Sequence, residues 1–154
     1  MVDYLFRAPT ARDCEILARS MRQCDMDEVR AACGRSLDAS DLLDSVNNSP
    51  ICVAVERNGR LLCIGGAARR SLLSTSGIPW MLGTHDLDSN GRLFMQHGRQ
   101  CVSVLLGRFS YLENYVDARN LKSIRWLKRM GFAVHDPEPY GCAGLHFRRF
   151  SASG

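Results

Sequence analysis

With 154 residues, of which 45% are hydrophobic and 23% charged, residues 1–154 have the size and composition of a single folded domain. No apolar run approaches the ~18–20 residues of a membrane span and no signal-peptide core is visible, so we expect a cytoplasmic protein with no membrane partner. The net charge of +4 is uneven: residues 1–50 carry −3, while residues 51–154 carry fourteen bases and seven acids, or +7, which favours an anionic ligand. Those bases are spread and no aromatic RNA-binding motif accompanies them, so nucleic acid is not expected.

The cysteines are odd in number and form no Cys-x-x-Cys pair. We therefore expect buried, reduced thiols, with neither disulfides nor a metal site. The seven are Cys14, Cys24, Cys33, Cys52, Cys63, Cys101 and Cys142.

The first third of the chain is acidic and predicts one strand followed by three helices. Residues 4–10 predict the strand, which Pro9 ends. Thr10 then caps a helix, with Asp13 in a capping-box position. A second helix stops at Gly34 and a third begins at Asp38. Their expected apolar positions are Cys14, Leu17, Ala18, Met21, Val29, Ala32, Cys33, Leu42, Leu43 and Val46.

Residues 51–66 contain the clearest local signal. Two runs rich in β-forming residues flank Asn58-Gly59, the dipeptide preferred in a two-residue type I′ turn. The segment predicts a β-hairpin.

Residues 78–84 predict a further strand, and 110–116 another. Between them lies a helix that Gly98 weakens by up to ~1 kcal/mol relative to alanine. We expect His97 on this helix to be hydrogen-bonded and mostly buried. The expected apolar face consists of Leu93, Phe94, His97, Cys101, Val104 and Leu105.

Residues 120–132 predict a short basic helix that opens at Asn120 and stops at Gly131. Residues 133–136 and 145–150 then predict two short strands, joined by a loop over 137–144. The whole order predicts an α/β (α+β) fold: a mixed, mostly antiparallel sheet of six or seven strands flanked by about four helices.

This order resembles that of the GNAT superfamily of N-acetyltransferases. The family motif after the fifth strand has Asn, a small residue, Leu-Tyr and Gly-Phe at fixed offsets. Five of the six positions here match or nearly match it, and Leu127 stands where tyrosine is usual. The six are Asn120, Ser123, Trp126, Leu127, Gly131 and Phe132.

Residues 112–132, with Trp80 to Thr84 upstream, also resemble divergent acetyltransferase-like proteins of short-tailed phages. Some of those are internal virion proteins. This likeness implies host cytoplasm or the virion as the location, and virion or host proteins as partners.

The GNAT resemblance implies acetyl-CoA as cofactor, bound between the fourth and fifth strands along residues 79–84. Its pyrophosphate would lie at the start of the next helix, although Asp86 and Asp88 bring negative charge there. The alternative, without a phosphate-binding role, is that residues 85–91 are only the capped start of a helix. The implied cofactor-binding residues are Leu82, Gly83, Thr84, Ser89, Asn90, Gly91, Arg92, Asn120 and Ser123.

Acetyl transfer needs a base for the acceptor ammonium and an acid for the leaving thiolate. Leu127 cannot donate a proton, so Tyr115 and Tyr140 are the candidate acids. Glu113 and His85 are the candidate bases. Tyr115 and Glu113 are also explained as ordinary alternating residues of a strand.

Two functions follow. One is an acetyl-CoA-dependent N-acetyltransferase acting on an amine of a small molecule or protein, with a CoA thioester as partner and no metal. The other is a catalytically degenerate phage protein of the same fold, acting as a virion component or by binding a host protein. The residues do not indicate an acceptor or an oligomeric state.

Overall fold

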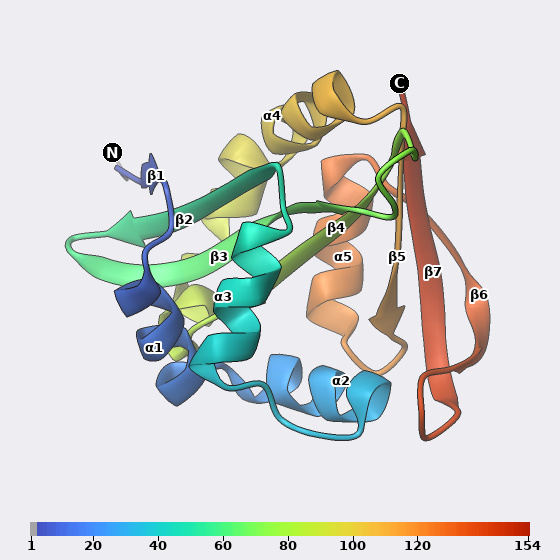
Figure 1. Ribbon diagram of the computed structural model, residues 1–154, viewed down its shortest axis with the longest axis horizontal. Coiled ribbons are helices and arrows are strands. Elements are labelled where there is room, and N and C mark those ends of the chain that lie inside the picture. The colour runs from blue at the N-terminus through green and yellow to red at the C-terminus, as the bar shows by residue number, and fades with distance from the viewer. Residues whose placement is uncertain (1–2) are drawn as a thin grey trace.

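The computed structural model describes residues 3–154 and contains one sheet with helices on both faces (Figure 1). The elements are β1 (Leu5–Arg7), α1 (Ala11–Ser20), α2 (Gln23–Cys33), α3 (Ala39–Asn47), β2 (Ile51–Arg57), β3 (Arg60–Arg69), β4 (Ser76–Gly83), the 3-10 helix η1 (His85–Asn90), α4 (Arg92–Arg108), β5 (Tyr111–Asp117), α5 (Leu121–Met130), β6 (Ala133–Tyr140) and β7 (Leu145–Ser153).

The seven strands run in the order β1-β2-β3-β4-β5-β7-β6, and only the β4–β5 pair is parallel. Helices α1, α2 and α3 lie on the face of the sheet turned to the viewer in Figure 1, whereas α4 and α5 cover the opposite face. The predicted fold class, a mixed and mostly antiparallel sheet flanked by helices, is confirmed.

Two apolar clusters fill these layers. On the α4–α5 face, Phe109, Leu112 and Val116 pack with Ile124 of α5. On the opposite face, Leu17 of α1 and Leu42 of α3 pack on Ile64 of β3. Both helical layers are therefore fixed to the sheet by buried apolar side chains, and α2 adds the buried residues Val29 and Ala31 outside these two clusters.

The turn and cap signals are confirmed. Asn58 and Gly59 both have positive φ, 53° and 76°, as a type I′ turn requires. Thr10 and Asp13 form the predicted capping box. Gly34 and Gly131 end α2 and α5 in the left-handed conformation, at φ 80° and 103°.

Two predictions about strand limits are wrong. The first strand is only Leu5–Arg7, because its register with β2 covers just these three residues. The last two strands are longer than predicted, and Pro137 and Pro139 lie inside β6. Proline is tolerated there because β6 is the outer strand and its free edge needs no N–H donors.

The predicted apolar face of α4 is also wrong in part. Cys101 is exposed, and so is Val104, at 55%. Gly98 is instead a contact point: a Cβ there would lie 2.5 Å from Cγ of Met130, so the glycine allows α5 to approach. His97 is partly buried, edge-on to the rings of Tyr4 and Phe6.

The prediction that all cysteines are buried is wrong for three of them, since Cys33, Cys101 and Cys142 are exposed. No two cysteines are bonded within residues 3–154, nor do these residues contain a group of three His, Cys, Asp or Glu side chains able to hold a metal ion. Among the helices described, none combines the length and apolarity of a membrane span.

Candidate functional site: the split between β4 and β5

The parallel strands β4 and β5 pair only at their start. Ser76 pairs with Tyr111 and Gly77 with Leu112, after which the two strands diverge (Figure 1). The ring of Phe109 lies against Gly77, where a Cβ would come within 2.7 Å of it. Glycine thus lets the two strands meet at the narrow end, and the split opens toward their C-terminal ends.

The ladder between β3 and β4 decides which main-chain groups face the split. Thr84 N–H donates to Leu62 O, so alternate residues of β4 bond to β3 and the others face β5. The residues that face β5 are Gly77, Pro79, Met81 and Gly83. Leu82 and Thr84, two predicted cofactor residues, instead bond to β3, and Thr84 is buried with its hydroxyl on Leu61 O.

Asn114 closes the narrow end of the split. Its side-chain Nδ2 donates to Pro79 O at 2.7 Å, and its Oδ1 accepts from Tyr115 N at 2.8 Å. One neutral amide thus bridges the two strands at the point where they separate.

Asp25 of α2 caps the open end on the β4 side. Its Oδ2 accepts the main-chain N–H of Gly83 at 2.7 Å, and the main-chain N–H of Arg22 donates to Gly83 O at 2.9 Å. Both groups that Gly83 would offer to an added strand are therefore occupied by residues of the α1–α2 junction.

The side chain of Arg22 is 1% exposed and completes this cap. It contacts Asp25 through Nε and Nη2, at 2.6 and 3.1 Å, and donates to Asp88 and to Ser123 Oγ. Its guanidinium also lies 5.1 Å from the ring centre of Trp126. Burial opposes the charge, yet the Asp25 carboxylate raises the pKa of Arg22 above its usual value.

Glu28 caps the opposite side of the open end. Its Oε1 accepts the main-chain N–H of Asp117 of β5 at 2.8 Å. Burial raises the pKa of Glu28 to about 7, and the charges of Asp25 and Asp117 add to this rise. The N–H of Asp117 and the side chain of Asn120 oppose it. This carboxyl group therefore changes charge near neutral pH.

Two polar groups along the split have no partner within residues 3–154. The Nδ2 of Asn120 is buried and makes no hydrogen bond of ordinary length, although it lies near enough to Glu28 to lower the pKa of that carboxyl group, while its Oδ1 caps α5 at Ser123 N. The main-chain groups of Met81 face the split at a level where β4 and β5 no longer pair. The middle of the split thus keeps free hydrogen-bonding capacity between its two closed ends.

The expected phosphate-binding segment differs from the prediction. Residues 85–90 form η1, which runs into α4, so Ser89 is not a helix cap; its hydroxyl donates to Asp86 O. Asn90 contacts Arg57 and Asp86 O, and Arg92 is exposed. Gly91 has φ −59°, which any residue adopts.

The structure brings together two of the predicted catalytic residues. The rings of Tyr115 and Tyr140 are stacked, with centres 3.9 Å apart. Burial, together with the nearby charges of Glu138 and Glu113, raises the pKa of Tyr115. Glu113 itself is paired with Arg149 at 3.0 Å and with Arg70 at 3.3 Å.

His85 and Leu127 lie elsewhere. His85 begins η1 with an exposed side chain, and within residues 3–154 its ring makes no hydrogen bond to the other candidates. Leu127 is partly buried against the apolar cluster under α4 and α5. The side chain at this position is thus part of the core.

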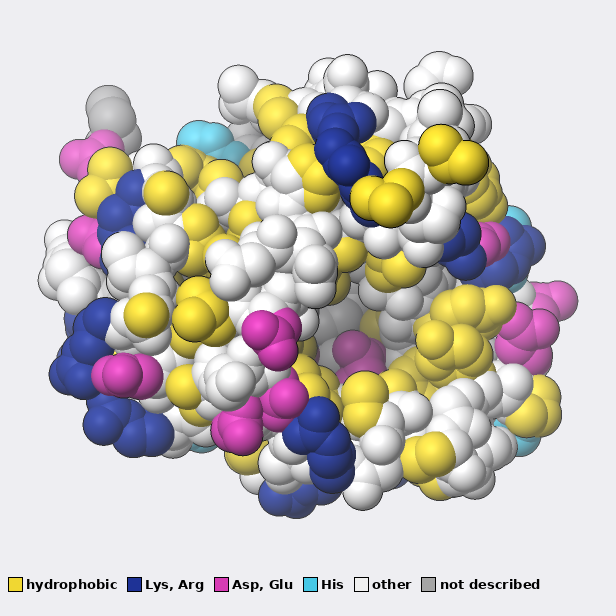
Figure 2. Space-filling model, in the orientation of Figure 1, with side chains coloured by type: hydrophobic (Ala, Val, Ile, Leu, Met, Phe, Trp, Pro, Cys, Tyr) yellow, Lys and Arg dark blue, Asp and Glu magenta, His cyan; other side chains and the backbone are white. Residues whose placement is uncertain are grey.

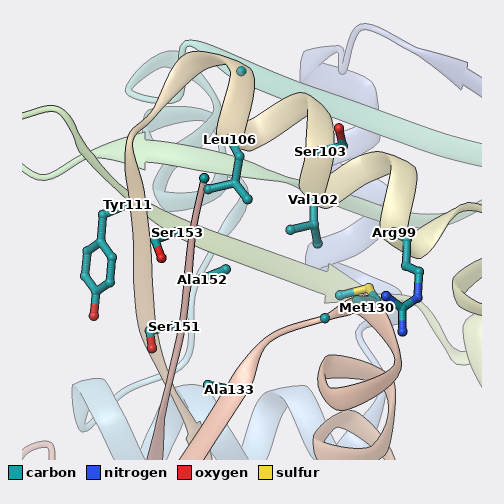
Figure 3. Close-up of a pocket in the computed structure, with 13 residues that line it drawn as sticks. Arg99, Val102, Ser103, Leu106, Tyr111, Met130, Ala133, Ser151, Ala152 and Ser153 are labelled. Atoms are coloured by element: carbon teal, nitrogen blue, oxygen red, sulfur yellow. The ribbon is translucent and has the colours of Figure 1, made fainter.

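Two hollows accompany the split. Figure 2 shows one on the α2–α3 face, between α3 above and α2 below, with an acidic side chain at its bottom. Figure 3 shows the other, about 780 Å³, on the opposite face between α4, the end of α5 and β7. Its one charged lining side chain is Arg99, and Tyr111 points away from it.

Sequence reasoning missed Arg22, Asp25 and Glu28. A signal was present, since charges at i, i+3 and i+6 share one face of a helix. On an acidic surface helix that pattern is ordinary, and only the position of α2 over the split gives it meaning.

The sequence matches no family model and no curated protein, but the fold matches solved acetyltransferases. Ribosomal-protein-alanine N-acetyltransferase from Brucella melitensis has a TM-score of 0.71 at 16% identity, covering 97% of this chain and 99% of that one. Spermidine N-acetyltransferase from Vibrio cholerae, in complex with CoA and spermine, has a TM-score of 0.69 at 13% identity, covering 97% of this chain and 95% of that one. The structure of yncA, a putative acetyltransferase from Salmonella typhimurium with acetyl-CoA, has a TM-score of 0.67 at 16% identity, covering 97% of this chain and 93% of that one. The chain has the GNAT acetyltransferase fold.

Proposed function

We propose that the protein is an amine N-acyltransferase that takes its acyl group from a CoA thioester, acetyl-CoA in the simplest case, held in the split between β4 and β5. The observation that carries the proposal is the free hydrogen-bonding capacity at the middle of the split, at Met81 and at the buried Nδ2 of Asn120. An amide-containing arm bonds to such groups as an added strand would. The fold, which is that of acetyltransferases, supports the same activity.

The residues fit the acyl arm better than the phosphates. Met81 would bond the arm through its main chain, and Asn120 would bond it through Nδ2. The start of α4 offers no comparable place for phosphates, because η1 continues into the helix and carries Asp86 and Asp88. When bound, the thioester supplies the acyl group, and its sulfur leaves as a thiolate.

The acceptor side of the proposal rests on Glu28. A carboxylate with a pKa of about 7 is suited to take a proton from an ammonium group at neutral pH. Glu113, paired with two arginines, is a poorer base. The hydroxyl groups of Tyr115 and Tyr140, whose rings are stacked, are the candidate proton donors for the thiolate. We therefore propose a cationic amine, on a small molecule or a protein, as the acceptor class.

A second candidate is a non-catalytic protein of the same fold that acts as a virion component or by binding a host protein. Two observations favour it: Leu127 replaces the usual tyrosine, and α2 occupies main-chain groups on both sides of the split. The phage connection stays a hypothesis, since the matched structures named above are acetyltransferases.

Calorimetry with acetyl-CoA, followed by a thiol-release assay with spermidine and lysine peptides, tests the proposal. Met81→Pro removes the N–H that faces the split, as Pro79 already does two residues earlier, and also removes the side chain of Met81 from the apolar cluster around Leu62 and Leu87, so circular dichroism must first show that the variant folds. We expect this variant to weaken acetyl-CoA binding by at least roughly tenfold, equivalent to about one hydrogen bond in free energy.

The matched control is Glu113→Gln, which should leave acetyl-CoA binding unchanged because Glu113 is engaged by Arg70 and Arg149. Acetyl-CoA binding without release of thiol for any amine would favour the non-catalytic candidate. No binding at millimolar acetyl-CoA would rule out the acyltransferase.

A further inference from the structure

Helix α2 carries one charged face, formed by Arg22 at its N-cap, Asp25 and Glu28. These residues are three positions apart, so their side chains lie along one line of the helix. Figure 1 shows α2 across the open end of the split between β4 and β5. We refer to these three residues as the charged face of α2.

The charged face hydrogen-bonds to main-chain groups of β4 and β5 that a neighbouring strand would otherwise bind. Asp25 accepts the N–H of Gly83 on β4, and Glu28 accepts the N–H of Asp117 on β5, at 2.7 and 2.8 Å. The main-chain N–H of Arg22 donates to Gly83 O. A ligand that pairs with β4 beyond Met81 as an added strand needs the N–H and C=O of Gly83, so the ligand and α2 compete for these two groups.

The first turn of α2 is attached mainly by polar contacts, whereas the second half of the helix buries the apolar residues Val29 and Ala31. Among the described residues, the buried members of the three apolar clusters include none from α2, and only Met26 packs at the margin of one. By contrast, α1, α3, α4 and α5 each contribute buried residues. Elements with few buried apolar contacts open at low free energy.

We infer that the first turn of α2, from Arg22 to Asp25, is a displaceable cap, and that a CoA thioester occupies the split only when this turn has moved off Gly83. This inference rests on the proposed function. It extends that function by stating that the resting protein is closed and that binding and the docking of α2 exclude each other.

The apparent affinity of such a protein is reduced by the fraction of molecules in which the cap is open. A change that undocks α2 without touching Met81 or Asn120 must therefore tighten binding. Asp25→Ala is that change, because it removes the acceptor for Gly83 N–H and leaves Arg22 buried without its partner. Asp27→Ala is the matched control, since Asp27 lies on the same helix, is exposed and contacts only Gln23.

Calorimetry with CoA on the full-length protein is the first measurement. We expect Asp25→Ala to bind CoA at least roughly tenfold more tightly than the native protein, and Asp27→Ala to bind as the native protein does. Arg22→Met, which removes the side-chain partner of Asp25, should act in the same direction and serves if Asp25→Ala fails to fold.

Amide hydrogen exchange on the native protein is the second measurement. Without ligand, Gly83 and Asp117 should be protected, and CoA should speed exchange across residues 23–33 while leaving α1 and α3 unchanged. That result, with the calorimetric one, supports the inference.

Equal affinity of the native protein and Asp25→Ala, with α2 exchange unaffected by CoA, overturns the cap and leaves the proposed function intact. Tighter binding to Asp25→Ala without acetyl transfer by any variant keeps the cap and overturns the acyltransferase. No heat with either protein at millimolar CoA overturns both.

Discussion

The two ends of the split between β4 and β5 are closed by different chemistry. At the narrow end, Gly77 and Leu112 pair through the main chain and a neutral amide, that of Asn114, bridges the strands. At the open end, the charged groups of Arg22, Asp25 and Glu28 cap the same two strands.

The difference is one of reversibility. The narrow end rests on the apolar cluster of Phe109 and Leu112, so opening it means unfolding the core. The open end depends on ion pairs and hydrogen bonds that protons, salt or a competing ligand can replace. One end of the split is therefore structural, and the other is suited to change.

The largest effect should come from the narrow end. Leu112 is fully buried beside Val116 and Phe109, so Leu112→Ala should lower the free energy of unfolding by about 2–5 kcal/mol. Urea denaturation followed by circular dichroism measures it. A loss below ~1 kcal/mol would show that the narrow end is as adaptable as the open end.

Arg22→Met should have a smaller effect, about 1–3 kcal/mol, because α2 can undock and return the unpaired Asp25 to water. Hydrogen exchange should show lost protection in residues 23–33 and an unchanged core. The matched control is Arg35→Met: Arg35 pairs with Asp41 in similar two-bond geometry but on the surface, so its melting temperature should not change measurably. Equal losses of stability in Arg22→Met and Arg35→Met would contradict the distinction between the buried ion pair of Arg22 and the surface ion pair of Arg35.

Glu28 should make stability depend on pH. Its pKa is raised from 4.5 to about 7 in the folded protein, so between these values the folded state keeps a proton that the unfolded state has released. The free energy of unfolding should therefore fall as pH rises from about 4.5 to about 7, by about 1–2 kcal/mol once screening is allowed for.

Denaturation of the native protein and Glu28→Gln across this pH range gives the comparison, and the difference between the two curves isolates Glu28 from Asp25 and Asp117. A constant difference from pH 4.5 to 7 would mean that Glu28 titrates normally.

Asn114→Ala should have the smallest effect, about 1 kcal/mol, because the partly buried groups Pro79 O and Tyr115 N can bond to water instead. Unlike the change at Glu28, its cost should be independent of pH, since an amide does not titrate. A pH-dependent cost would indicate that the two ends of the split are coupled.

Much of the fold could be predicted, because its signals are local. Asn58-Gly59 predicts its turn and Gly131 its helix stop, since each needs a backbone conformation that few residues adopt. The limits of β6 could not be predicted in the same way. Pro137 and Pro139 usually break strands, and only the position of β6 at the sheet edge makes them acceptable.

The same distinction between local and long-range relations applies to the candidate site. The sequence by itself determined that Asn120 caps α5 and that Tyr115 and Glu113 share one face of a strand, because those relations span a few residues. Only the tertiary structure decided that Asp25 reaches Gly83 and that Glu28 reaches Asp117, across 58 and 89 positions of sequence. Contacts between distant segments depend on how the helical layers pack on the sheet, and no local pattern encodes which main-chain groups that packing leaves for α2 to cap.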